Sequence, residues 1–182
     1  MANIFIVTIK DISPEGLRLK TQWGIQTTAT LLEEVPTCAK VYSPLMLDFS
    51  FTLVQTDIIL DGLLNVGLGM ACARCLSEFT CPLDIRFRYL YRPESEQHNE
   101  PDKELNQDDL EIVYYTGEHI DLKPLVREQL YLNIPHYPHC SDNCRGLCPG
   151  CGVNLNKAAC RCPSGSGNKE SAFAVLGTLK KH

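Results

Sequence analysis

The chain has 182 residues, of which 44% are hydrophobic and 21% are charged, so it can bury an ordinary core and is neither disordered throughout nor fibrous. Its formal net charge of −5 argues against binding of nucleic acid through overall charge, because phosphate contacts draw on surplus lysine and arginine. Ten cysteines are unusual for this length, and their role depends on the redox state of the compartment.

The first residues do not have the pattern expected of an export signal. The segment MANIFIVTIK lacks a basic leader region, and Thr8 and Lys10 interrupt its apolar run. No stretch reaches the about 20 apolar residues of a membrane span. We therefore expect a cytoplasmic protein with no membrane partner, and in a reducing cytosol clustered cysteines bind metal more often than they form disulfides.

Alternation of apolar and polar residues predicts a sheet in the first half of the chain. A first strand is expected at residues 3–9, whereas the pattern between Pro14 and Pro44 is mixed and predicts no element. Strict alternation then recurs in three segments, at 45–53, 64–70 and 83–91. This succession predicts an α+β protein with an antiparallel sheet or a partly closed barrel and a few helices.

The chain divides into four expected parts: a strand-rich domain at 1–91, an acidic flexible linker at 92–109, a strand, turn and helix packing on the sheet at 110–135, and a cysteine-rich zinc module with a C-terminal helix at 136–182. Eight acidic residues and one lysine between 93 and 111 predict the linker. Asp121 is expected to cap the helix, which Pro135 stops. The last helix is expected at 171–180.

Eight of the ten cysteines form four close pairs: Cys72 with Cys75, Cys140 with Cys144, Cys148 with Cys151, and Cys160 with Cys162. A C-x-x-C turn lets two sulfurs reach one zinc ion at about 2.3 Å while backbone amides point at the thiolates. Pro149, Gly150 and Gly152 favour such a turn around the third pair. We therefore predict that the eight cysteines bind one or two Zn²⁺ ions.

Spacing does not decide which pairs share an ion. The pair 72/75 could share one with 148/151, which would join the tail to the sheet. Alternatively, 148/151 could combine with 160/162 into a self-contained module. His136 or His139 could replace Cys140 as a ligand.

Two other cysteine chemistries stay open, namely redox disulfides and an iron–sulfur cluster. The remaining two cysteines are not expected to take part in either. Cys81 shares the parity of its apolar neighbours and is expected in the core, and Cys38 is expected to be a buried or incidental thiol.

Catalytic signatures are incomplete. The deaminase pattern H-x-E followed by P-C-x-x-C is matched in its first half by His98-Asn99-Glu100, but Leu147 rather than proline precedes Cys148. Ser166 lies in S-G-S-G and not in the G-x-S-x-G of a hydrolase elbow, and no phosphate-binding loop occurs. We therefore expect a non-enzymatic binder or scaffold with no small-molecule substrate.

Three motifs together carry a family resemblance: Cys72-Ala-Arg-Cys75-Leu76, the capped segment from Asp121 to Pro135, and the run from Cys144 to Cys162. In this combination the chain resembles the YceD-type family, which is named for large ribosomal RNA subunit accumulation. The resemblance covers residues 45–180. The matched positions are the eight paired cysteines with Gly146, Leu147, Gly152 and Asn156.

The resemblance implies a role in producing or stabilising large-subunit ribosomal RNA, without known enzymatic activity. The expected partner is either that RNA or its precursor, or a ribosomal protein or assembly factor through which the protein affects RNA indirectly. A zinc-joined protein scaffold or a thiol switch without direct RNA contact is the alternative. One departure is present: residues 169–173 stand where many members carry an Asp-Pro-Arg triplet, so a contact made by that arginine is not expected here.

Overall fold

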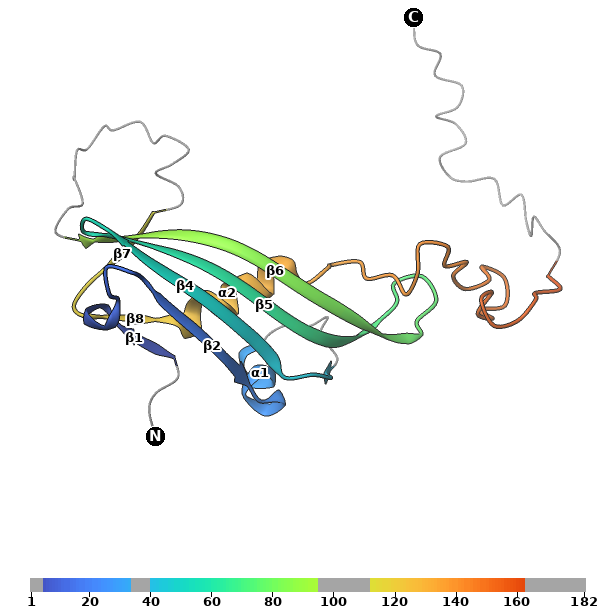
Figure 1. Ribbon diagram of the computed structural model, residues 1–182. Helices are drawn as coiled ribbons and strands as arrows, with labels where there is room; N and C mark the ends of the chain where they lie inside the picture. The colour runs from blue at the N-terminus through green and yellow to red at the C-terminus, as the bar shows by residue number, and fades with distance from the viewer. Residues whose placement is uncertain (1–4, 34–39, 95–111, 163–182) are drawn as a thin grey trace, which may run out of the picture.

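The computed structural model describes residues 5–33, 40–94 and 112–162. Cys38, most of the expected acidic linker and the expected helix at 171–180 lie outside these residues. A long curved sheet runs the length of the folded body, and one end of it lies beside the cysteine-rich segment that follows helix α2 (Leu122–Asn133) (Figure 1). The cysteine pairs therefore lie at one end of the molecule, beyond the apolar core.

The main sheet has six strands, ordered β2-β4-β5-β6-β7 with β3 pairing beside β5. Their bounds are β2 Leu17–Trp23, β3 Lys40–Val41, β4 Leu45–Val54, β5 Asp57–Ala71, β6 Glu78–Pro93 and β7 Ile112–Tyr115. All pairs are antiparallel except β6 with β7, which is parallel. The predicted sheet is confirmed, but the partly closed barrel is wrong: in the described part of the chain, β2 and β7 are opposite edges of an open sheet.

Two strand assignments differ from the expectation. The alternation at 64–70 marks only the second half of β5, because Gly62 interrupts the apolar series and Ile59 and Leu63 on the other face blur it. The mixed region after Pro14 contains strand β2 and the short helix α1 (Ile25–Leu31). Trp23 at the end of β2 is buried in the core, so tertiary packing rather than local pattern defines that strand.

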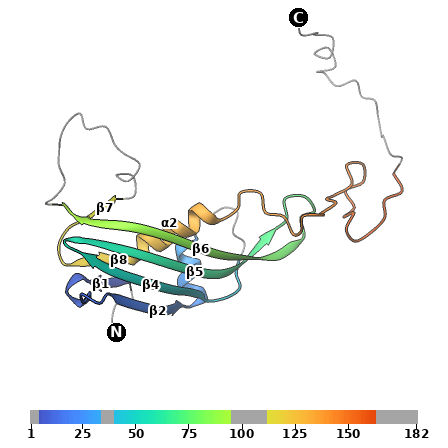
Figure 2. The same ribbon diagram turned by 45° about the horizontal axis from the view of Figure 1, so that its top comes forward.

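One face of the sheet carries the core. Every second residue of β5 is buried there, and the cluster continues into helix α2 (Leu122–Asn133), which lies along this face (Figure 2). A two-stranded ribbon of β1 (Ile6–Thr8) and β8 (His119–Asp121), with a 3₁₀ turn at Ile9–Asp11, packs into the same cluster. Asp121 accepts a hydrogen bond from the Lys123 backbone N–H at 2.9 Å and so caps α2, as expected.

The hairpin of β5 and β6 is longer than its neighbours. Its register runs from Ile58 opposite Tyr91 to Ala71 opposite Glu78, whereas β4 accompanies β5 only as far as Asn65. The far part of the hairpin therefore extends beyond β4, with only β3 pairing beside it among the described strands, and presents its tip, residues 72–77, to the cysteine-rich segment (Figure 1). Among the described residues, no helix is long and apolar enough to span a lipid bilayer.

Gly62 makes room for an aromatic ring in the core. It lies opposite Phe87 in the β5–β6 register, and a Cβ atom at position 62 would overlap the Phe87 ring. We expect Gly62→Ala to lower the free energy of unfolding by about 1–3 kcal/mol, because the ring must leave its position.

The matched control for this change is Gly67→Ala in the same strand. An added Cβ there meets Ser43 Oγ at 3.3 Å, so we expect a loss of less than about 1 kcal/mol. Urea denaturation of both variants measures the difference, and equal midpoints would contradict the packing role of Gly62.

Candidate metal centre

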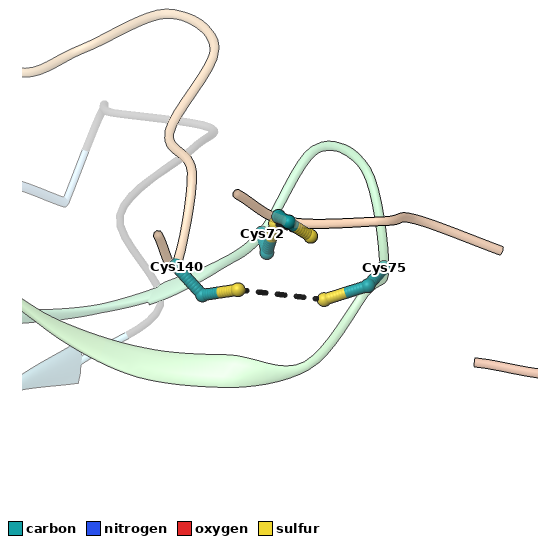
Figure 3. A group of neighbouring side chains, drawn as sticks. Cys72, Cys75 and Cys140 are labelled. Carbon is teal, nitrogen blue, oxygen red and sulfur yellow. Dashed lines mark hydrogen bonds between the residues drawn. The ribbon is translucent and has the colours of Figure 1, made fainter. Parts of the chain in front are cut away.

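The eight paired cysteines lie in two groups of four. Within each group, all the Sγ atoms lie within 4.8 Å of one another. The hairpin cluster is formed by Cys72, Cys75, Cys140 and Cys144, and the tail cluster is formed by Cys148, Cys151, Cys160 and Cys162. In Figure 3, the Cys75 and Cys140 sulfurs point at each other across the space between the hairpin tip and the segment after α2.

The structure resolves the pairing that spacing left open. The pair 72/75 is joined by 140/144, and 148/151 is joined by 160/162, so the tail cluster is self-contained. The arrangement of 72/75 with 148/151 is not formed. Neither His136 nor His139 belongs to a group, although Pro138 between them accepts a hydrogen bond from the Ala73 N–H at 2.8 Å.

The distances within both groups suit tetrahedral coordination of one metal ion. Four sulfurs at about 2.3 Å from zinc form a tetrahedron whose edges are about 3.8 Å long. In the hairpin cluster, Cys72–Cys144 and Cys75–Cys140 each have Sγ atoms 3.7 Å apart. The tail cluster is tighter, with Sγ separations of 3.2 Å for Cys148–Cys160 and 3.5 Å for Cys151–Cys160. Zinc fits the donor set, and its binding remains a prediction.

The first cysteine pair of each cluster lies on a turn of its own, and the two turns have the same hydrogen-bond pattern. In residues 72–77 the first cysteine donates its N–H to the sixth residue's carbonyl at 2.9 Å and accepts at its own carbonyl from the fifth residue at 2.9 Å. Residues 148–153 repeat both bonds at 2.8 Å. In each turn the third residue's N–H also donates to the first cysteine's Sγ at 3.4 Å. Such N–H groups stabilise thiolates, as a metal site requires.

Two asparagines connect the tail to the hairpin cluster. Asn154 Nδ2 donates to the Cys75 carbonyl at 3.3 Å and to Ser77 Oγ at 2.9 Å. Asn156 Nδ2 donates to Cys144 Sγ at 3.3 Å. Sequence reasoning matched Asn156 to the family but gave neither asparagine a role. Their signal is the N-x-N spacing directly after the second turn, which places both amides on the first cluster.

Burial differs between the clusters. Cys72, Cys75 and Cys144 are buried and form a small core of their own, with Phe79 packed against it. In the tail cluster Cys148 is buried, but Cys151 is exposed and the other two are half-buried. The hairpin cluster thus takes the place of apolar packing between two distant segments, and the tail cluster folds a local loop. Cys81 is half-buried beside the main core.

The thiols of the hairpin cluster differ in acidity. Burial raises the pKa of Cys72, but backbone N–H groups, led by that of Cys140, outweigh burial and lower the pKa to about 6. Burial raises the pKa of Cys140 to about 12, and the thiols of Cys144 and Cys75 add to the rise. The cluster without metal therefore holds both thiolate and protonated thiol at neutral pH.

The thiols of the tail cluster also differ in acidity. The Cys151 backbone N–H and the Cys160 thiol lower the pKa of Cys148 to about 6. The Cys160 and Cys151 thiols raise the pKa of Cys162 to about 12. A zinc ion binds thiolates, so its entry into either cluster must displace protons.

The sequence of this chain matches a known protein family. The model of the family described as "Large ribosomal RNA subunit accumulation protein YceD" matches residues 60–180, which include both clusters. This chain belongs to the YceD family. The resemblance indicated by the cysteine motifs is thereby confirmed, and YceD proteins are named for accumulation of large-subunit ribosomal RNA.

Relatives of the YceD chain are named alike or uncharacterized. A chloroplastic YCED homolog 1 of Arabidopsis thaliana is 36% identical over 62 residues, 34% of this chain. The Zea mays protein of the same name is 24% identical over 150 residues, 69% of this chain, and an uncharacterized Mycobacterium leprae protein is 25% identical over 149 residues, 80% of it. The matches cover 19%, 51% and 66% of those proteins. No solved structure matches the chain.

Separate clusters predict separate losses of metal. The wild-type YceD chain should bind two zinc ions, whereas Cys72→Ser and Cys148→Ser should each leave one, because the clusters share no cysteine. Cys72→Ser should also lower the melting temperature by roughly 5 °C or more, since its cluster joins distant segments. Metal analysis and thermal unfolding measure both effects, with Cys81→Ser as the control that keeps two ions. Loss of both ions from either variant would contradict two independent sites.

Zinc affinity should fall as pH falls. Near pH 7 at least Cys140 in one cluster and Cys162 in the other are protonated without metal, so each ion displaces at least one proton. The apparent affinity should drop at least about tenfold per pH unit, and more steeply below pH 6, where Cys72 and Cys148 also gain protons. Competition with a zinc chelator between pH 8 and pH 5 measures this. A pH-independent affinity would exclude thiolate ligands.

Proposed function

We propose that this YceD protein is a non-enzymatic zinc-binding factor that supports accumulation of large-subunit ribosomal RNA during ribosome biogenesis. The observation that supports it most is the hairpin cluster, in which four thiols from two distant segments converge at the spacing of a tetrahedral site. The match to the YceD family over residues 60–180 includes both clusters and supports a role for the cysteine end of the molecule.

The donor sets support a structural role for the metal. A catalytic zinc keeps one coordination position open for water or substrate, whereas a structural zinc is closed by four protein ligands. Each cluster offers four cysteine sulfurs and so would leave no position for a substrate. A structural site of this kind contributes apparent binding energy of about 10–16 kcal/mol, enough to hold the tail in place.

The sheet offers little free positive charge for RNA. Arg88 Nε donates to Asp61 at 2.7 Å, and Arg18 makes a two-bond contact with Asp48 at 2.9 and 2.8 Å. The Arg18 guanidinium lowers the pKa of Asp48 to about 2, so this carboxylate stays charged at neutral pH. The exposed sheet face thus carries matched charges, and a route to ribosomal RNA through a ribosomal protein or assembly factor is at least as well supported as direct contact.

The thiols also bear on the compartment. Eight reduced cysteines are needed to fill both clusters, and an oxidising compartment would convert close pairs to disulfides. We therefore propose that the protein works in a reducing compartment, the cytoplasm, while the two plant relatives carry names that place them in the chloroplast.

A deletion strain tests the proposed function. Cells without this protein should have a lower ratio of large-subunit to small-subunit ribosomal RNA, and wild type and Cys81→Ser should both restore it. Cys72→Ser should fail to restore the ratio, because the hairpin cluster cannot form. Quantifying both RNAs measures this, with protein levels checked in parallel. Full restoration of the RNA ratio by Cys72→Ser at a normal protein level would contradict a role for the hairpin cluster.

A further inference from the structure

At their fifth position the two cysteine turns carry different residues on a similar backbone. The fifth residue of each turn has a positive φ, 58° at Leu76 in the hairpin and 73° at Gly152 in the tail. Both residues donate their N–H to the carbonyl of the first cysteine, at 2.9 Å and 2.8 Å. Glycine adopts this conformation without strain, whereas a side chain crowds the backbone there. The tail turn therefore has the residue that its backbone favours, and the hairpin turn does not.

Packing among the residues that the structure describes does not explain the leucine. Leu76 is 66% exposed, although its neighbours Cys75 and Ser77 are held by Asn154. A side chain left mainly in water gains little from burial, so it does not offset the strain of a positive φ. Strain of this kind at an exposed apolar residue is a feature of functional sites.

We propose that Leu76 is an apolar anchor that inserts the hairpin tip into a pocket on a protein component of the large-subunit precursor. This inference rests on the proposed function and names the class of partner. The hairpin cluster and the hydrogen bonds from Asn154 hold the tip, so the anchor is preorganised and little conformational entropy is lost on binding. Tyr137, which is 78% exposed, precedes the Pro138 carbonyl that binds Ala73 and adds a second apolar side chain to this end.

The charge at this end favours a protein over an RNA partner. In residues 72–78 and 136–162, four basic side chains (Arg74, Arg145, Lys157 and Arg161) accompany two acidic ones (Glu78 and Asp142). Each cluster of four thiolates around Zn²⁺ would add two negative charges, which leaves a net charge of −2. With both ions bound, this end would offer no surplus positive charge to a phosphate backbone and would complement a basic protein surface with an apolar pocket.

Leu76→Gly separates binding from folding, because residue 152 shows that glycine fits the same turn. Gln55→Gly is the matched control, since Gln55 also has a φ of 58° and lies in the β4–β5 turn at the other end of β5. We expect both variants to keep the zinc content of the wild type and a melting temperature within about 3 °C of it.

Binding is measured by co-sedimentation of the full chain with large-subunit precursor particles purified from cells that lack this protein. Leu76→Gly should weaken binding at least about tenfold, and Gln55→Gly should leave it unchanged. A photoreactive phenylalanine at position 76 should crosslink to a protein of the particle. Unchanged binding of Leu76→Gly, a wild-type chain that does not bind, or a crosslink to RNA or to the chain itself would each overturn the proposal.

The ribosomal RNA ratio of the deletion strain tests the proposed function independently. If wild type restores the ratio and Leu76→Gly restores it equally well, the anchor is excluded while the proposed function stands. If deletion leaves the ratio unchanged, the proposed function fails whatever the variants bind.

Discussion

Convergence of four thiols at the hairpin tip is the constraint on which the arrangement of this molecule depends. The tip contains few apolar side chains, and of the strands that the structure describes only the short β3 pairs with the overhanging part of the hairpin. Backbone bonds such as Ala73 to Pro138 and Leu147 to Arg74 orient the tail, but each contributes only about 1 kcal/mol net. Thiolate–zinc bonds would supply the remaining stabilisation, which elsewhere in the chain comes from buried leucine and phenylalanine.

The sheet and α2 place the two halves of this cluster. The long register of β5 with β6 carries Cys72 and Cys75 past the end of the core. Helix α2 runs along the core and ends at Asn133, after which the chain reaches Cys140 beside the tip. Burial of the apolar face of α2 therefore sets the distance between the two cysteine pairs. The tail turn, with Asn154 and Asn156 against the hairpin, then follows from local bonding.

Sequence alone indicated the features that depend on local pattern. Strict alternation predicted β4 and β6, Asp121 and Pro135 bounded α2, and the C-x-x-C spacing selected the eight cysteines that converge. The start of β5 was missed because Gly62 interrupts its apolar series, and the partner of each cysteine pair was undecided because spacing carries no information on reach. The role of Leu76 was equally hidden, since its backbone angle becomes visible only when the two turns are compared.

The difference in chain length between the clusters affects the order in which they form during synthesis. Cys148 and Cys160 are 12 positions apart, whereas Cys72 and Cys144 are 72 apart, so closing the longer loop costs about 1.6 kcal/mol more chain entropy. A nascent chain also exposes Cys72 and Cys75 long before their partners leave the ribosome. Until α2 has docked, these two thiols are only half of a metal site, so they can bind a wrong partner or become oxidised. The residues that later join the hairpin tip to the segment after α2 are thus also the ones most exposed to error in the newborn chain.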